Sequence, residues 1–153
     1  MSELKIAAHP SVITTLGLGS CVGITLYDPC KKIVGLAHVM LPSISHARNK
    51  TNIAKFADTA ILKMLEEMLE KGAKRSEVVS KLAGGAQMFA FGVRNEMLSI
   101  GERNVASAKK VLKDLSIPII SEDTGGNYGR TIEVSSEDGS LMIKTIGHGI
   151  STI

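Results

Sequence analysis

The sequence is poor in aromatic residues and in cysteine. Only 3% of its 153 residues are aromatic, none is Trp, and two are Cys. Two cysteines without repeated spacing disfavour a disulfide framework and a zinc site, so we expect no metal. The formal charge is only +3, with basic residues scattered among acidic ones. A nucleic-acid partner is therefore not expected, because such proteins usually carry a basic stripe with interleaved aromatic residues.

Long hydrophobic runs are also missing. No apolar segment approaches the roughly 20 residues needed to cross a membrane, and the N-terminus lacks the basic-then-apolar pattern of a secretory signal. We therefore expect a cytoplasmic protein without membrane insertion. The hydrophobic content of 44% and the charged content of 22% are typical of a globular protein. The length predicts a single domain over residues 1–153.

The spacing of apolar residues predicts several strands and a small number of helices. Amphipathic patterns predict a helix over 53–71 and another over 102–115, and the polar segment 43–52 is expected to be a mobile loop. Predicted strands cover 11–16, 22–27, 33–41, 78–83, 117–121, 131–135 and 141–146. Because short turns join many of these strands, we expect an α+β fold in which helices cover largely antiparallel strands.

One segment contains both a cysteine and an isolated histidine. Residues 14–42 read TTLGLGSCVGITLYDPCKKIVGLAHVMLP, with Cys21 after a glycine-rich bend and His38 inside an apolar run. Asp28 followed by proline suits a type I turn, and a hairpin that pairs Asp28 with Lys31 places Cys21 opposite His38. Directly opposed residues have Cβ atoms about 4.5–5.5 Å apart. A single bulge would instead put the two side chains on opposite faces of the sheet.

A thiol and an imidazole at this distance have the chemistry of a nucleophile and its base. The thiolate is the reactive form, and an ordinary thiol with a pKa of about 8.5 is mostly protonated at neutral pH. The imidazole of His38 can accept the proton of Cys21 and later return it to a leaving group. A third group usually orients the histidine. Thr14 and Thr15 both offer hydroxyls at the end of the preceding strand, and the chemistry alone does not choose between them.

The glycine-rich bend before the cysteine has a possible part in the same chemistry. Gly17 and Gly19 permit a tight bend, in which amide groups near the cysteine, together with Ser20 or its amide, can point at a developing oxyanion. The bend does not extend to a dinucleotide-binding motif, since Val22 occupies the third glycine position, and it lacks the lysine of a phosphate-binding loop.

Each of these side chains also has a purely structural interpretation. A cysteine beside a strand is most often a small buried hydrophobic residue, and a lone histidine in an apolar strand is often a hydrogen-bonded core residue. Cys30 is expected to be exposed in the turn and to lack a nearby base. Other expectations are surface placement for His9, His46 and His148, and helix-core placement for Met64 and Met68.

Taken together, blocks along most of the chain resemble one known family. Residues 15–22 (TLGLGSCV) and 37–42 (AHVMLP) resemble the CheD family of chemoreceptor glutamine deamidases. Further blocks in family order are ADTAI at 57–61, GGAQMF at 84–89, IGERN at 100–104 and GGNYGR at 125–130. The segment 43–52 is not a close match.

The resemblance implies a cysteine hydrolase that converts specific glutamines in the cytoplasmic helices of bacterial chemoreceptors to glutamate and releases ammonia. It implies a layered α/β sandwich with helices packed outside, similar to the catalytic domain of the cytotoxic necrotizing factor deamidases. Residue by residue, it assigns Cys21 as nucleophile, His38 as general base and acid, and Thr15 as the orienting hydroxyl. No metal or organic cofactor is implied.

The resemblance also implies a partner, the chemotaxis phosphatase CheC, which binds CheD proteins and can restrain the deamidase. Two alternatives stand beside the deamidase. One is a non-enzymatic adaptor that binds chemoreceptors or CheC, with Cys21 merely structural. The other is a cysteine amidase for small substrates.

Overall fold

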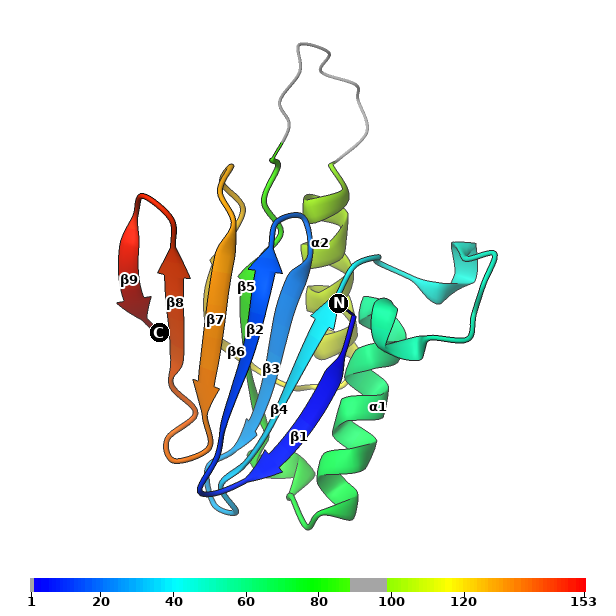
Figure 1. The fold of residues 1–153 in the computed structure, drawn as a ribbon. Coiled ribbons are helices and arrows are strands. Elements are labelled where there is room, and N and C mark those ends of the chain that lie inside the picture. Colours follow the sequence, from blue (N-terminus) through cyan, green and yellow to red (C-terminus); the bar gives the residue numbers. More distant parts are fainter. Residues whose placement is uncertain (1, 89–98) are drawn as a thin grey trace.

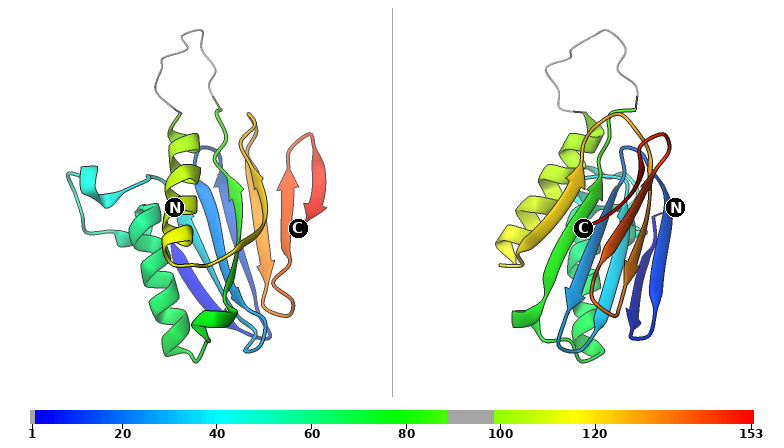
Figure 2. Two further views of the ribbon diagram at one scale, coloured as in Figure 1. Left: turned by 180° about the vertical axis from the view of Figure 1, so that it is seen from behind. Right: turned by 90° about the vertical axis from the view of Figure 1, so that its left-hand side faces the viewer.

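In the part of the chain that the structure describes, two β-sheets and two α-helices are stacked in three layers (Figures 1 and 2). This computed structural model describes residues 2–88 and 99–153. The larger sheet has the strand order β1-β4-β3-β5-β6, with β1 at Leu4–Ala8, β4 at Ile33–Val39, β3 at Val22–Asp28, β5 at Val79–Gly84 and β6 at Ile119–Thr124. The smaller sheet has the order β2-β7-β8-β9, with β2 at Val12–Leu18, β7 at Arg130–Ser135, β8 at Leu141–Thr145 and β9 at Gly149–Thr152.

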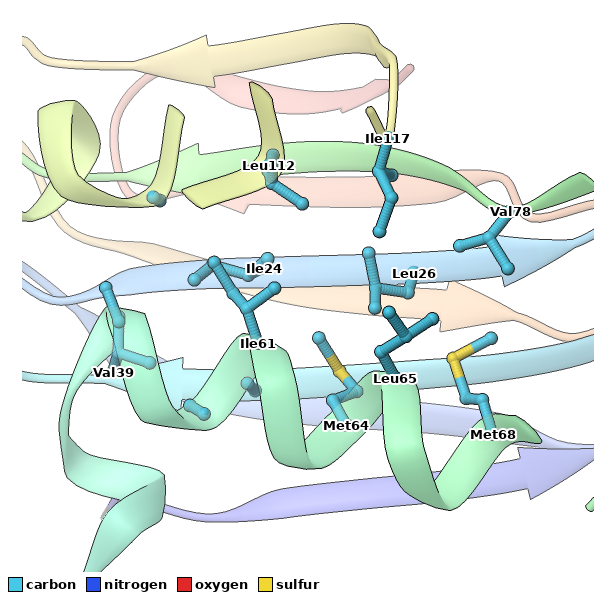
Figure 3. Packing of buried hydrophobic residues seen from close by; sticks show 14 of the residues in the cluster. Ile24, Leu26, Val39, Ile61, Met64, Leu65, Met68, Val78, Leu112 and Ile117 are labelled. Atoms are coloured by element: carbon cyan, nitrogen blue, oxygen red, sulfur yellow. The ribbon is translucent and has the colours of Figure 1, made fainter. Parts of the chain in front are cut away.

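Both α-helices pack on the outer face of the larger sheet. Helix α1 (Ala57–Glu70) follows a short 3₁₀ turn at Ile53–Lys55, so the helix begins later than predicted. Helix α2 (Ile100–Asp114) starts at a capping box in which the Ser99 and Glu102 side chains each accept the other's backbone N–H. Figure 3 shows the apolar side chains of α1, with Met64 and Met68 in the core as expected, packed against β3, β4 and α2.

The larger sheet is covered on both faces, by the helices on one side and by the smaller sheet on the other (Figure 2). Every residue of β3 and β4 is consequently buried. This explains why these strands read as apolar runs without alternation. The layered α+β architecture predicted from the sequence is therefore confirmed. The short strands β1 and β9, at the edges of the two sheets, were not predicted.

The turn between β3 and β4 differs from the prediction. Asp28 pairs with Ile33 and not with Lys31, because the turn contains four residues and Lys32 adopts a positive φ of 51°. The carboxylate of Asp28 accepts the backbone N–H groups of Cys30, Lys31 and Lys74. The amide of Lys74 comes from a distant segment, which stabilises the wider turn in a way that local sequence does not reveal.

The wider turn moves the strand register by two residues. His38 now faces Gly23, and Cys21 lies two residues before that pair instead of directly opposite the histidine. An even shift leaves every side chain on its predicted face. The prediction of direct opposition is wrong, whereas the prediction of a shared face survives, with the two residues in a diagonal relation.

Candidate active site

Several chain segments converge at one end of the larger sheet. The loop between β2 and β3, the end of β4, the end of β5 and the start of α2 lie together there (Figure 1). At the start of β3, Val22 pairs with Val39 on one side and with Gly84 on the other, which brings the ends of β4 and β5 next to the loop that carries Cys21. The residues predicted to form a site are thus gathered in one place.

Thr15 and His38 are hydrogen-bonded across the two sheets. Thr15 Oγ1 lies 2.8 Å from His38 Nδ1, and only 5% and 2% of these residues, respectively, are exposed. Thr14 points the other way and donates its hydroxyl to Glu133, since successive residues of a strand face opposite sides. The geometry therefore chooses Thr15 over Thr14 as the hydroxyl that contacts the histidine.

The second nitrogen of His38 is left uncommitted. His38 Nε2 is buried and has no hydrogen-bond partner in the part of the chain that the structure describes. The crevice beside Thr15 and His38 leaves no room for a water molecule. Burial lowers the pKa of His38 from its ordinary value of 6.5, so the imidazole is neutral at neutral pH. A neutral ring with one nitrogen anchored and the other free is suited to accept a proton.

Cys21 lies on the side of the larger sheet that faces the smaller sheet, as His38 does. Its half-buried side chain packs against the apolar cluster between the two sheets. Burial raises the pKa of the Cys21 thiol above its ordinary value, and the residue's own backbone N–H, close to the sulfur, partly offsets this effect. The structure shows no hydrogen bond between Cys21 Sγ and His38 Nε2. Both side chains are therefore neutral in this arrangement.

The backbone carbonyl groups of Cys21 and of the two residues before it are all hydrogen-bonded. Three successive carbonyl oxygens of the β2–β3 loop accept hydrogen bonds from groups on the β5 and α2 side of the site. The Ala86 amide donates to the Gly19 carbonyl oxygen at 2.8 Å, and the Gly85 amide donates to the Cys21 carbonyl oxygen at 2.8 Å. Between them, Asn104 Nδ2 donates to the Ser20 carbonyl oxygen at 3.0 Å.

The amide groups of the same loop are divided between two roles. Gly17 has a φ of 72°, and its carbonyl accepts the N–H of Gly19, so the Gly19 amide is engaged within the bend. The N–H and C=O of a trans peptide point in opposite directions. The amides of Ser20 and Cys21 therefore point away from Ala86 and Asn104. No described backbone carbonyl accepts a hydrogen bond from either amide, and the Cys21 N–H lies close to its own sulfur.

Asn104 is a site residue that the sequence analysis missed as a functional candidate. It is fully buried on α2, and its Nδ2 donates to the carbonyls of Ser20 and Met40, both at 3.0 Å. The signal for it was present, because Asn104 shares the buried face of the helix with the apolar residues Ala108 and Leu112. A single polar residue on such a face is a candidate for a specific role.

A cavity of about 170 Å³ lies just beyond the end of β4. Its wall includes the segment 43–52, which was expected to be mobile but here carries a 3₁₀ turn at Ile44–His46. Asp58 accepts hydrogen bonds from Ser43 Oγ and the Ile44 amide, which anchors this wall. The lining residues are Leu41, Pro42, Ser43, His46, Ala47, Phe56, Ile100 and Arg103.

Among the remaining candidate residues, His46 lines the cavity beyond β4, and Cys30, His9 and His148 do not. Cys30 is exposed as expected, and its thiol donates to Glu77 Oε2 at 3.6 Å. The three other histidines, at positions 9, 46 and 148, are exposed as predicted. Phe89, part of the GGAQMF block, lies outside the described residues. Within 2–88 and 99–153, no helix has the combined length and apolarity to cross a membrane.

Comparison with known proteins identifies the family. Residues 40–145 match the family model described as CheD chemotactic sensory transduction, which is more than half of the chain. The chain belongs to the CheD family. The stretch with Thr15, Cys21 and His38 precedes the region that this CheD model matches, but full-length alignments with CheD relatives include it.

Curated relatives are similar over nearly their whole length. The probable chemoreceptor glutamine deamidase CheD of Caldanaerobacter subterraneus subsp. tengcongensis is 56% identical, covering 100% of this chain and 94% of the relative. The chemoreceptor glutamine deamidase CheD of Halalkalibacterium halodurans is 49% identical, covering 97% of this chain and 93% of the relative. Among solved structures, the Bacillus licheniformis hypothetical protein YfiH is similar with a TM-score of 0.49 and 15% identity, over 79% of this chain and 49% of that one.

Proposed function

We propose that this CheD-family chain is a chemoreceptor glutamine deamidase that works through Cys21, His38 and Thr15. Its substrates are glutamine side chains on chemoreceptor cytoplasmic helices, which it converts to glutamate with release of ammonia. The names of the full-length relatives support the reaction and the substrate class. The observation that carries the mechanism is the buried Thr15–His38 hydrogen bond, which leaves His38 Nε2 free on the face that Cys21 shares.

The first step is attack of the Cys21 sulfur on the carboxamide carbon. Both side chains start neutral, so His38 acts as a general base during the attack and no preformed ion pair is required. When His38 Nδ1–H donates to Thr15 Oγ1, the lone pair of Nε2 is free to accept the thiol proton. A side-chain rotation closes the gap between sulfur and nitrogen, as is common when a catalytic hydrogen bond tightens only with substrate bound.

The carbonyl oxygen of the substrate becomes an oxyanion as the C–S bond forms. The amides of Ser20 and Cys21, which no described backbone carbonyl accepts, donate hydrogen bonds to this oxygen in the proposed mechanism. Because the carbonyls of the same peptides are fixed by Ala86 and Asn104, the two N–H groups need no reorganisation during the reaction.

Three further proton transfers through His38 complete the reaction. His38 first gives its proton to the leaving nitrogen, the C–N bond breaks, and ammonia departs to leave a thioester on Cys21. A water molecule then gives a proton to His38 and attacks the thioester carbon. The C–S bond breaks, the new glutamate carboxyl group leaves, and the thiol recovers its proton from His38. No external oxidant, reductant or cofactor enters this balance.

We further propose a cytoplasmic location and the phosphatase CheC as a partner, both on the family resemblance.

The competing proposal is an adaptor that binds receptors or CheC. A raised pKa of Cys21 is also expected for a thiol with a purely structural role, so this observation is compatible with the adaptor. A mild thiol reagent at neutral pH separates the two. The enzyme requires labelling of Cys21 that slows in His38→Ala, because the imidazole assists the neutral thiol, whereas the adaptor requires labelling that does not depend on His38.

The direct test is deamidation of a purified chemoreceptor signalling fragment, followed by mass spectrometry of its glutamine-containing peptides. The wild-type chain and the matched control Cys30→Ala should convert glutamine to glutamate, while Cys21→Ala and His38→Ala should not. The rate should decline with falling pH only below 6.5, because protonation of His38 removes the base and its pKa is lowered. Conversion by Cys21→Ala at the wild-type rate would eliminate the mechanism.

A further inference from the structure

Asn104 connects the two halves of the proposed catalytic pair. Its single Nδ2 donates one hydrogen to the carbonyl of Ser20, which precedes the nucleophile, and the other to the carbonyl of Met40, two residues after His38. Both distances are 3.0 Å, and the side chain is fully buried. One amide group thus fixes the distance between the β2–β3 loop and the end of β4.

We propose that Asn104 is a positioning residue for the Cys21–His38 pair. It holds the cysteine loop at a fixed separation from β4, and it orients the Ser20–Cys21 peptide so that the Cys21 N–H points toward the sulfur side of the site. The second effect follows from peptide planarity, because the carbonyl directed at Asn104 forces the N–H to the opposite side. This inference rests on the proposed function, since it concerns the same nucleophile and base.

The chemistry of the position favours asparagine over an apolar residue. The two hydrogens of one Nδ2 satisfy two carbonyls simultaneously, which neither a hydroxyl nor a carboxylate can do. Asn104 Oδ1, in contrast, is buried and has no partner among the described residues. A buried carbonyl oxygen without a partner costs stability. The two hydrogen bonds from Nδ2, which hold the Ser20 and Met40 carbonyls in place, are therefore the feature that the side chain provides.

The helix that carries Asn104 has little freedom to move. A Cβ atom at Gly101 would lie 2.5 Å from the Gly85 carbonyl oxygen and 2.7 Å from that of Ala86, so α2 lies directly on this segment. The amides of Gly85 and Ala86 in turn hold the carbonyls of Cys21 and Gly19. The helix that presents Asn104 to the loop is therefore in close backbone contact with the segment that also holds the loop.

The experiment compares Asn104→Leu and Asn104→Gln with the control Ser107→Ala. Ser107 lies one turn along α2 and donates its hydroxyl to the Pro42 carbonyl, so the control removes a hydrogen bond between α2 and the segment after β4 without reaching the cysteine loop. We expect kcat for the receptor fragment to fall about a hundredfold in both Asn104 variants, since a displacement of about 1 Å at a site has this effect. KM should stay within about twofold, because Asn104 is buried beneath the site and does not touch substrate.

A second readout is the rate at which iodoacetamide alkylates Cys21 as a function of pH. The rate should fall in both Asn104 variants, as in His38→Ala, and should remain at the wild-type level in Ser107→Ala. This measurement needs no deamidation, so it tests the positioning role even where the proposed function fails. Circular dichroism and thermal melting establish which variants are folded.

Three results would overturn the proposal. One is a folded Asn104 variant with the kcat and alkylation rate of the wild type. Another is an equal loss in Ser107→Ala, which would assign the effect to general docking of α2. The third is failure of both Asn104 variants to fold, which would make the residue a requirement for folding and not for positioning.

Discussion

Thr15 and His38 illustrate what burial does to individual side chains. They come from different sheets, both are almost fully buried, and they share one hydrogen bond of 2.8 Å. Burial lowers the pKa of His38 and raises that of Cys21. Both directions favour uncharged groups, so the proposed mechanism depends on proton transfer during attack and on the orientation of the imidazole ring. Thr15 contacts Nδ1 of that ring through its hydroxyl.

Replacing Thr15 by valine should therefore lower kcat while the fold is retained. The change leaves His38 Nδ1 buried without a partner, which costs about 1–3 kcal/mol. If this cost appears in the transition state, the rate falls by about tenfold to a hundredfold. The measurement is the kinetics of receptor-fragment deamidation. Thr15→Ser, which keeps the hydroxyl, should recover most of the activity.

Thr14→Val is the matched control for this prediction. The same substitution one residue earlier removes only a surface hydrogen bond to Glu133, so activity should stay near the wild-type value. Equal losses in the two valine variants would refute the orienting role of Thr15.

At the scale of secondary-structure elements, the contact between α2 and the segment after β5 supports the site. Gly101 lets the helix approach the backbone of Gly85 and Ala86, whose amides hold the cysteine loop. An element that is distant in sequence from Cys21 thereby determines how the carbonyls around Cys21 are oriented. The contact is backbone to backbone, so any added side-chain atom at position 101 disturbs it.

Gly101→Ala should be destabilising, against the usual trend. In an exposed helix the change stabilises by about 1 kcal/mol, but here the new methyl group would lie 2.5 Å from a carbonyl oxygen. Overpacking of this kind costs about 1–3 kcal/mol, and the displaced segment should also reduce deamidation. Urea denaturation together with the activity assay measures both effects.

Gly129→Ala provides the comparison, because a Cβ there meets only the Leu18 carbonyl oxygen at 3.9 Å. Stability and activity should both remain near wild type in this variant. An increase in stability for Gly101→Ala would contradict the close approach of α2.

At the scale of the whole molecule, the two hydrophobic clusters have different relations to function. One lies between the helices and the larger sheet, and the other lies between the two sheets. The second cluster determines how β2 sits on β4, and hence whether Thr15 reaches His38. Both clusters contribute to stability. The first also holds α2, which carries Asn104, against the larger sheet, and the second sets the approach of Thr15 to His38.

A pair of substitutions on opposite faces of the larger sheet separates these contributions. Met64 packs over Gly35 of β4 from the helix side, and Ile132 packs over Gly23 of β3 from the side of the smaller sheet. Met64→Ala and Ile132→Ala should each destabilise by about 2–5 kcal/mol. At a temperature where both variants remain folded, we expect a larger loss of deamidation in Ile132→Ala, because Gly23 is the residue that faces His38.

Chemical denaturation and steady-state kinetics on the same preparations give the comparison. If Met64→Ala and Ile132→Ala lose the same free energy of unfolding and have the same deamidation activity, the packing between the sheets does not influence the site.

The sequence by itself determined the elements and the architecture. Helical periodicity and apolar strands are local patterns, so the two helices, seven of the nine strands in the described residues and the α+β layering were all predictable. The sequence also placed Cys21 and His38 on one face of the sheet. A register shift of two residues does not change this, because side chains alternate between faces with a period of two. The family resemblance added Thr15, which the residues alone did not distinguish from Thr14.

Only the tertiary structure decided the register and the contacts that join distant segments. Asp28 in the four-residue turn after β3 accepts the amide of the distant Lys74, and Asn104 on α2 bridges the Ser20 and Met40 carbonyls. These interactions depend on where separate elements come together in space, which no local pattern specifies. The sequence therefore determined which groups are available for chemistry, and the packing of two sheets and a helix determined how far apart they are held.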